Sequence, residues 1–193
     1  MYGRDSSGVG RPVLVDAGGR LVGLAGKYQD AAINGRLFFS STQTHVATST
    51  TKNNTFTGIA LVNPSTSGKL YIVHEFSYAL DNSPSADTNL SLATGPEHSG
   101  YAADLAIQCT RYGKAGSAAI VDTAATIVGA SLTIVKHIAT LGTNLTTDLL
   151  THTPPVDLGG SIILDPGRIV CTDGILASGA FLFLAFMWEE INV

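Results

Sequence analysis

The fold class is decided by residues 69–80, which read KLYIVHEFSYAL. Apolar and polar residues alternate along this stretch, and a period of two over twelve residues is typical of a long β-strand. Strict alternation places six residues on one, more apolar face: Leu70, Ile72, His74, Phe76, Tyr78 and Leu80. The other six, Lys69 to Ala79, fall on the opposite face.

Further strand-like segments, separated by turn residues, lie on both sides of residues 69–80. Residues 55–62 read as a second strand, and the turn residues Asn63 to Gly68 join it to the first, which predicts an antiparallel pair. Asp165-Pro166-Gly167 predicts another tight turn, while residues 101–110 and 115–127 are Ala-rich and ambiguous. Further strands are predicted at Arg36–Ser40, Asn89–Thr94, Ala130–Ile138, Ser161–Leu164 and Arg168–Thr172. The sequence therefore predicts an all-β protein, a jelly-roll-like antiparallel β-sandwich over residues 27–193.

The last predicted strand, Ala180–Trp188, is apolar at every position, so both of its faces need cover. A loop or helix over the outside of a sandwich is one explanation, and a neighbouring subunit is the other. We expect the subunit, because a low charge content elsewhere also indicates concealed surface. The residues assigned to that interface are Leu182, Leu184, Phe186 and Trp188.

Residues 1–26 form a separate, glycine-rich segment that we expect to be an extended N-terminal arm. Its apolar patches, Val13–Val15 and Leu21–Leu24, flank Asp16-Ala17-Gly18-Gly19 and could pair as a hairpin, with pairing to a neighbouring subunit as the alternative. Such a segment buries little side-chain surface by itself and becomes ordered only by docking.

Composition restricts the class of protein. Charged residues make up 13% of the 193 residues and the net charge is −4, which argues against a disordered tail, a coiled coil or a dedicated nucleic-acid binder. Cys109 and Cys171 match no metal or disulfide spacing, so free buried thiols are expected. The N-terminus has no apolar signal-peptide core, and the longest apolar run is too short to span a bilayer, so no membrane partner is expected.

Candidates for chemistry are few. The five histidines show no metal-binding spacing, and Glu97-His98 is the best acid/base pair, although a solvated loop explains it as well. Arg111-Tyr112-Gly113-Lys114 reads as a turn, with too few charges to bind nucleic acid. We therefore expect no enzyme, no metal and no cofactor. Tyr101, Tyr112 and Asp104 are the first residues to consider if the domain binds carbohydrate.

Three segments resemble virion proteins of tailed bacteriophages, most of all the small decoration (cement) proteins of the head. They are residues 11–21 (RPVLVDAGGRL), 58–70 (GIALVNPSTSGKL) and 186–191 (FMWEEI). The resemblance implies a homotrimeric jelly roll on the capsid exterior, made in the host cytoplasm, that binds the major capsid protein through its arm. The arm residues expected to bind are Arg4, Arg11, Val13, Leu14, Val15 and Arg20. A receptor- or carbohydrate-binding head fibre, spike or tail module is the alternative.

Overall fold

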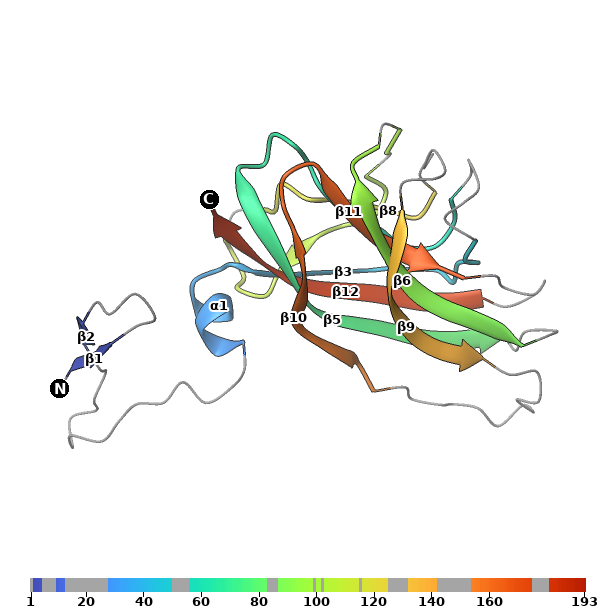
Figure 1. The fold of residues 1–193 in the computed structure, drawn as a ribbon, viewed down its shortest axis with the longest axis horizontal. Coiled ribbons are helices and arrows are strands. Elements are labelled where there is room, and N and C mark those ends of the chain that lie inside the picture. The colour runs from blue at the N-terminus through green and yellow to red at the C-terminus, as the bar shows by residue number, and fades with distance from the viewer. Residues whose placement is uncertain are drawn as a thin grey trace.

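The computed structural model describes residues 2–4, 10–12, 28–49, 56–82, 87–98, 100–101, 103–114, 116–124, 132–141, 154–174 and 181–193. Over these residues the chain is almost entirely β, with two antiparallel five-stranded sheets packed as a sandwich (Figure 1). The predicted all-β sandwich is confirmed.

The two sheets are named here after their central strands. The β12 sheet has the order β10-β5-β12-β3-β7, with strands Val156–Leu164, Lys69–Asn82, Phe181–Asn192, Leu37–Ser41 and Gln108–Cys109. The β11 sheet has the order β8-β4-β11-β6-β9, with strands Ile120–Asp122, Ala60–Asn63, Arg168–Asp173, Thr88–Pro96 and Thr133–Leu141. Strands β7 and β8 lie in the ambiguous Ala-rich segments and extend one edge of each sheet.

Strands joined by the shortest turns belong to different sheets. Strand β4 pairs with β8 and β11, whereas β5 pairs with β10 and β12, so the predicted antiparallel pair of these two strands is wrong. The predicted turn at residues 165–167 is present, with Gly167 at φ 80°, but it also joins strands of opposite sheets. Both turns are corners of the sandwich, because the chain leaves one sheet and enters the other.

Asn63 holds these two corners together. Its side chain is buried, and its Nδ2 donates to the carbonyl oxygens of Lys69 at 2.7 Å and of Leu164 at 2.8 Å. The backbone carbonyl of Asn63 accepts a hydrogen bond from the Gly167 amide at 2.8 Å. One amide side chain at the end of β4 therefore satisfies carbonyls in β5 and β10, the two strands across each corner.

A β-bulge breaks the alternation predicted for residues 69–80. Glu75 is paired with Met187 and Val73 with Trp188, so His74 is the extra residue in β5. Tyr71 and Val73 point into the core before the bulge and Phe76 does so after it. The predicted single face of even-numbered residues is therefore correct only from Phe76 onward, because one inserted residue reverses the side on which the following side chains lie.

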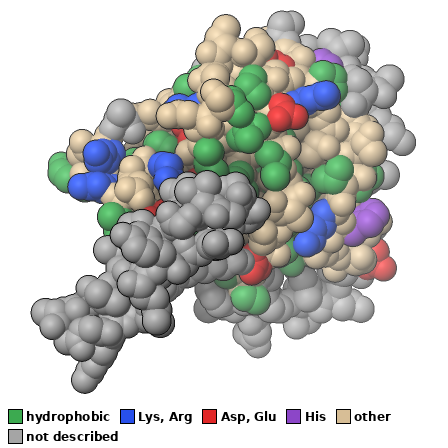
Figure 2. All heavy atoms as spheres, turned by 60° about the vertical axis from the view of Figure 1, so that its left-hand side comes forward, with side chains coloured by type: hydrophobic (Ala, Val, Ile, Leu, Met, Phe, Trp, Pro, Cys, Tyr) green, Lys and Arg blue, Asp and Glu red, His purple; other side chains and the backbone are tan. Residues whose placement is uncertain are grey.

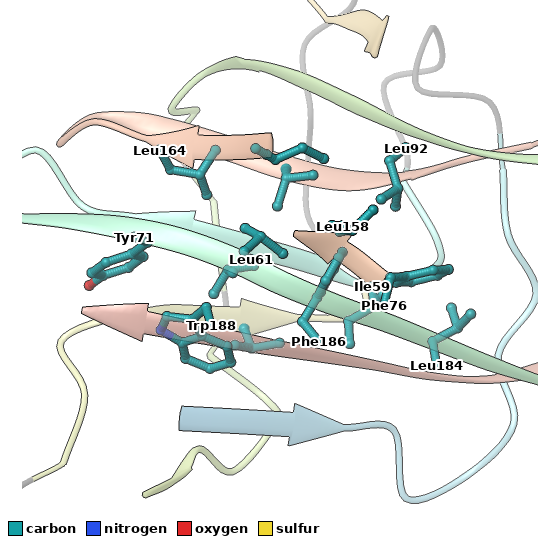
Figure 3. Packing of buried hydrophobic residues seen from close by; sticks show 14 of the residues in the cluster. Ile59, Leu61, Tyr71, Phe76, Leu92, Leu158, Leu164, Leu184, Phe186 and Trp188 are labelled. Carbon is teal, nitrogen blue, oxygen red and sulfur yellow. The ribbon is translucent and has the colours of Figure 1, made fainter. Parts of the chain in front are cut away.

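The core lies between the two sheets. Figure 3 shows Trp188, Phe186 and Leu184 of β12 facing side chains of the opposite sheet such as Leu61 and Leu92. The aromatic members of the core include Trp188, Tyr71, Phe76 and Phe186, each at most 1% exposed. Aromatic rings supply large buried area, and the rings of Phe76 and Phe186 pack in a tilted arrangement with centroids 5.1 Å apart.

The outside of the β11 sheet carries a second, smaller apolar cluster. Ala60, Val62, Ala93, Ile169 and Cys171 point outward from its strands and are fully buried, beneath loop residues Phe56, Tyr101 and Leu132. The central strands of this sheet are therefore covered on both faces by residues of the same chain, whereas Ile134 and Val135 on the edge strand β9 are 43% and 48% exposed.

Three short elements precede the sandwich strands. Strands β1 (Tyr2–Arg4) and β2 (Gly10–Pro12) pair with each other and lie apart from the sandwich, and helix α1 (Gln29–Ile33) lies between them and the β12 sheet (Figure 1). The hairpin predicted between Val13–Val15 and Leu21–Leu24 lies outside the described residues.

Candidate functional site: the outer face of the β12 sheet

The four residues assigned to a subunit interface lie in the core. Leu182, Leu184, Phe186 and Trp188 are each at most 2% exposed and pack between the sheets. A side chain that fills the interior of one protomer is not available to a second one, so the assignment of these four residues to a subunit interface is wrong. The sequence could not distinguish the two faces, because both are apolar.

The opposite face presents apolar residues to the outside, which we call the outer-face patch: Phe39, Ala79, Phe183, Ala185 and Met187. Phe39 is 42% exposed and Phe183 is 38% exposed. Strand pairing places these residues side by side, since Met187 is opposite Phe39, and Phe183 is opposite Ala79. The patch therefore includes parts of β3, β12 and β5, with Ser41 and Ser77 opposite Ala185 and Glu75 opposite Met187.

A groove of about 250 Å³ runs into this patch. Small residues, among them Ser77, Ala79 and Ala185, form part of its lining, and Phe183, Tyr78 and Pro155 are larger members. A row of small side chains between bulky ones leaves a depression with the width of a side chain. The lining is mainly apolar, which suits a hydrocarbon or aromatic group from a partner.

His45 lies at one end of the patch. Its ring stacks on Phe181 at 4.4 Å and approaches Phe183 edge-on at 6.3 Å, both between ring centroids. Its Nδ1 lies 2.6 Å from Oδ2 of Asp81. The segment that carries His45 is held along β12 by the paired backbones of Val46 and Leu182.

Helix α1 covers the other end of the face. Tyr28, just before the helix, packs on His74 at 4.6 Å between centroids, and His74 Nε2 lies 3.3 Å from Glu189 Oε2. Arg36 bridges Glu189 at 3.0 Å and Asp30 at 2.6 Å. These contacts anchor the start of the sandwich to β5 and β12, so the bulge residue His74 serves as a docking point for α1.

A buried carboxylate lies inside this end of the sandwich. Glu190 is 4% exposed, and its Oε2 lies 2.6 Å from Lys69 Nζ. Its Oε1 accepts from Trp188 Nε1 at 3.3 Å and from the Ser117 hydroxyl. Burial, reinforced by the charge of Glu190, raises the pKa of Tyr71. Because Glu190 of β12 contacts Lys69 of β5 and Ser117 in the segment after β7, this cluster fastens these three parts of the chain together.

The acid/base pair suggested by Glu97-His98 is not formed. Glu97 Oε2 accepts from the Ser65 amide at 2.9 Å, and the His98 backbone amide donates to the Tyr101 hydroxyl at 2.9 Å. Each residue therefore takes part in a separate loop contact, and both are half-buried rather than solvated.

The residues suggested for carbohydrate binding are dispersed. Tyr101 packs under the loops of the second cluster, where burial raises its pKa to about 12. Asp104 accepts from the Thr123 amide at 3.0 Å. Only Tyr112 is fully exposed, on the Arg111–Lys114 turn, which is present as predicted with Gly113 at φ 78°. These three residues do not converge on one site.

The arm residues are described only in part. Arg4 lies in β1 and Arg11 in β2, where the backbone of Arg4 pairs with Gly10 and that of Arg11 with Gly3. Val13, Leu14, Val15 and Arg20 lie outside the described residues.

In the part of the chain that the structure describes, no group of three or more His, Cys, Asp or Glu could hold a metal ion, and no helix is long and apolar enough to cross a membrane. Both cysteines are free, Cys171 buried and Cys109 partly so. The face shown in Figure 2 is mainly uncharged, with charged side chains few and scattered.

Comparison with known proteins gives no relative. No protein-family model, no curated protein and no solved structure matches the chain.

Proposed function

We propose that the chain is a structural virion protein, which binds the outside of a tailed-phage capsid as a homotrimer and cements neighbouring major capsid subunits. Its work in this proposal is adhesion, which needs buried area and backbone hydrogen bonds.

The strand order is the observation that carries the proposal. Numbered 1 to 8, the main strands β3, β4, β5, β6, β9, β10, β11 and β12 are arranged 1-8-3-6 in one sheet and 2-7-4-5 in the other. We infer a jelly roll from this order, a fold common among viral capsid and lectin domains. Because one fold serves many functions, this supports the class of protein and needs a direct test.

Two of the segments that resemble phage virion proteins lie in the strands of the sandwich. Residues 58–70 form β4 and the corner into β5, and residues 186–191 belong to β12. Both segments are therefore part of the framework, as expected for a likeness between structural proteins. The paired β1–β2 hairpin stands outside that framework, where an arm could reach a neighbouring capsid subunit (Figure 1).

Deleting residues 1–26 tests the arm. We expect a sandwich with unchanged circular dichroism that no longer binds capsids purified from the source particle, whereas the full chain binds. Substituting Arg4, Arg11 and Arg20 with Ala, and separately Val13, Leu14 and Val15 with Ser, measures the charged and apolar shares of that binding.

Two results would contradict the proposal. Equal capsid binding by the deleted and full chains would remove the role of the arm. An image reconstruction of the source particle without density for this protein on the capsid would remove the cementing function, and specific signals on a glycan array would then favour the receptor-binding alternative.

A further inference from the structure

A groove of about 450 Å³ lies between the two sheets at one side of the sandwich, and we call it the β9–β10 groove. One wall comes from β6 and β9 of the β11 sheet, and the other comes from β10, the outermost strand of the β12 sheet. The corner between β10 and β11 completes the lining with Asp165 and Arg168. This volume falls within the ~300–1,000 Å³ typical of sites for small ligands.

The polar side chains of this groove have no partner inside the protein. Five of them line it, and none has a hydrogen bond or an ion pair with another described part of the chain: Thr94, Thr133, Ser161, Asp165 and Arg168. The groove beside Glu190 differs, because its cations Lys69 and Arg36 are already paired with carboxylates. The polar groups of the β9–β10 groove are therefore free to bind a ligand.

The two charges of the groove select a ligand without net charge. The guanidinium of Arg168 only donates hydrogen bonds, and a carboxylate such as that of Asp165 only accepts them. An anion attracted by Arg168 is repelled by Asp165, and a cation meets the reverse. A wholly apolar ligand would take both groups out of water without replacing their hydrogen bonds. A ligand rich in hydroxyl groups suits both, because each hydroxyl donates and accepts.

Aliphatic side chains lie between these polar groups. Ile163 of β10 is 56% exposed and Val135 of β9 is 48% exposed, and Pro96 also lines the groove. A sugar ring presents C–H faces between its hydroxyls, so one saccharide can cover the aliphatic side chains while its hydroxyls reach the polar groups. Burial of the aliphatic surface then adds to the hydrogen bonds.

An extended peptide is the competing ligand, and the strand edges disfavour it. A peptide that adds a strand to a sheet needs a regular edge with a row of free backbone groups. Strand β9 carries two bulges, with Val135 and Ile138 as the extra residues. Beside the groove, β10 pairs regularly with β5 only over Ile162–Leu164. Neither edge therefore offers a long, regular template.

We infer that the β9–β10 groove binds a neutral saccharide, with Asp165 and Arg168 bonding its hydroxyls and Ile163 and Val135 covering a face of its ring. This goes beyond the proposed function and does not depend on it, because none of these residues belongs to the arm.

A glycan array screened with the full chain, followed by NMR titration of the ¹⁵N-labelled protein with the strongest neutral saccharide, tests the groove. We expect the amide signals of residues 94–96, 133–135 and 161–168 to shift on titration. An array that shows no neutral saccharide bound, or shifts confined to residues outside the groove, would overturn the inference. Signals from charged glycans alone would also overturn it.

Two variants test the assigned groups. Arg168→Ala should weaken binding of that saccharide at least about tenfold, because it removes a charged donor. Asp165→Asn should weaken it about fivefold, and it retains the side-chain oxygen that favours the Asp-Pro-Gly turn. Lys114→Ala is the matched control, since Lys114 is an exposed cation on the turn after β7, and the affinity should not change. A wild-type affinity in a folded Arg168→Ala would overturn the inference.

Two further readouts keep these results interpretable. Circular dichroism shows whether each variant is folded, and the titration of the wild-type chain decides the case if a variant is not. Capsid binding is measured separately. Saccharide binding that depends on Arg168 supports the groove whether or not the chain binds capsids, whereas capsid binding without saccharide binding supports the proposed function and contradicts the groove.

Discussion

Phe183 and Phe186 lie three residues apart in β12, and their side chains point to opposite sides of the sheet. Phe186 is 1% exposed and packs against the ring of Phe76, while Phe183 is 38% exposed and lines the groove of the outer-face patch. Substituting each with Ala therefore tests which face is the core.

Phe186→Ala should lower the free energy of unfolding by about 3–5 kcal/mol, because it leaves a cavity in the core. Phe183→Ala should cost less than about 1 kcal/mol when measured at concentrations where copies are dissociated. Urea unfolding monitored by circular dichroism gives both values, and equal losses would contradict the assignment of faces.

Asn63 should be required for the corners of the sandwich. Replacing it with Ala removes three hydrogen bonds: the two that it donates to the carbonyls of Lys69 and Leu164 and the one that it accepts from the Ser67 hydroxyl. We expect a loss of about 2–4 kcal/mol in unfolding free energy. Thr66→Ala, exposed in the same turn, should change it by less than about 0.5 kcal/mol. A tolerated Asn63→Ala would show that the corners do not depend on this side chain.

Substitutions of Lys69 and of the buried Glu190 should have strongly non-additive effects on the free energy of unfolding. Lys69→Met leaves the carboxylate of Glu190, whose side chain is 2% exposed, without its cation and should cost about 2 kcal/mol. Glu190→Gln in the same chain removes that buried charge and keeps an acceptor for Trp188 and Ser117, so the double variant should be more stable than Lys69→Met alone. A double-mutant cycle measures the coupling, and simple additivity would contradict it.

The protein should lose stability at alkaline pH, and the first group responsible should be the thiol of Cys171. Burial, with a smaller contribution from the charge of Asp173, raises the pKa of this thiol above its ordinary value of 9.0. Above about pH 9 the unfolded chain loses this proton while the folded chain keeps it, so folding becomes less favourable by about 1.4 kcal/mol per pH unit.

The variant Cys171→Ala should begin this decline near pH 10, the ordinary value for the buried tyrosines Tyr71 and Tyr101. Denaturant unfolding from pH 8 to 11 measures the shift. The same onset in both proteins would contradict a buried, protonated thiol.

The framework strands could be predicted because their residues alternate or lie between strong turn signals. Strand β5 and the turn at Gly167 are predicted in this way. Strands β7 and β8 were not, because three residues or fewer among Ala and Gly give no period, and only the neighbouring edges of β3 and β4 define them.

The sequence by itself determined the β class of this protein, its turns and the unusual apolar character of its last strand, since these depend on local periodicity and backbone preference. Tertiary structure decided which sheet each strand joined and which face of β12 pointed inward. A short turn allows either a hairpin or a corner, and Asn63 selects the corner by bonding across it. When both faces of a strand are apolar, only packing against the rest of the chain decides which face is buried. The bulge at His74 in turn reverses the buried face of the neighbouring strand β5.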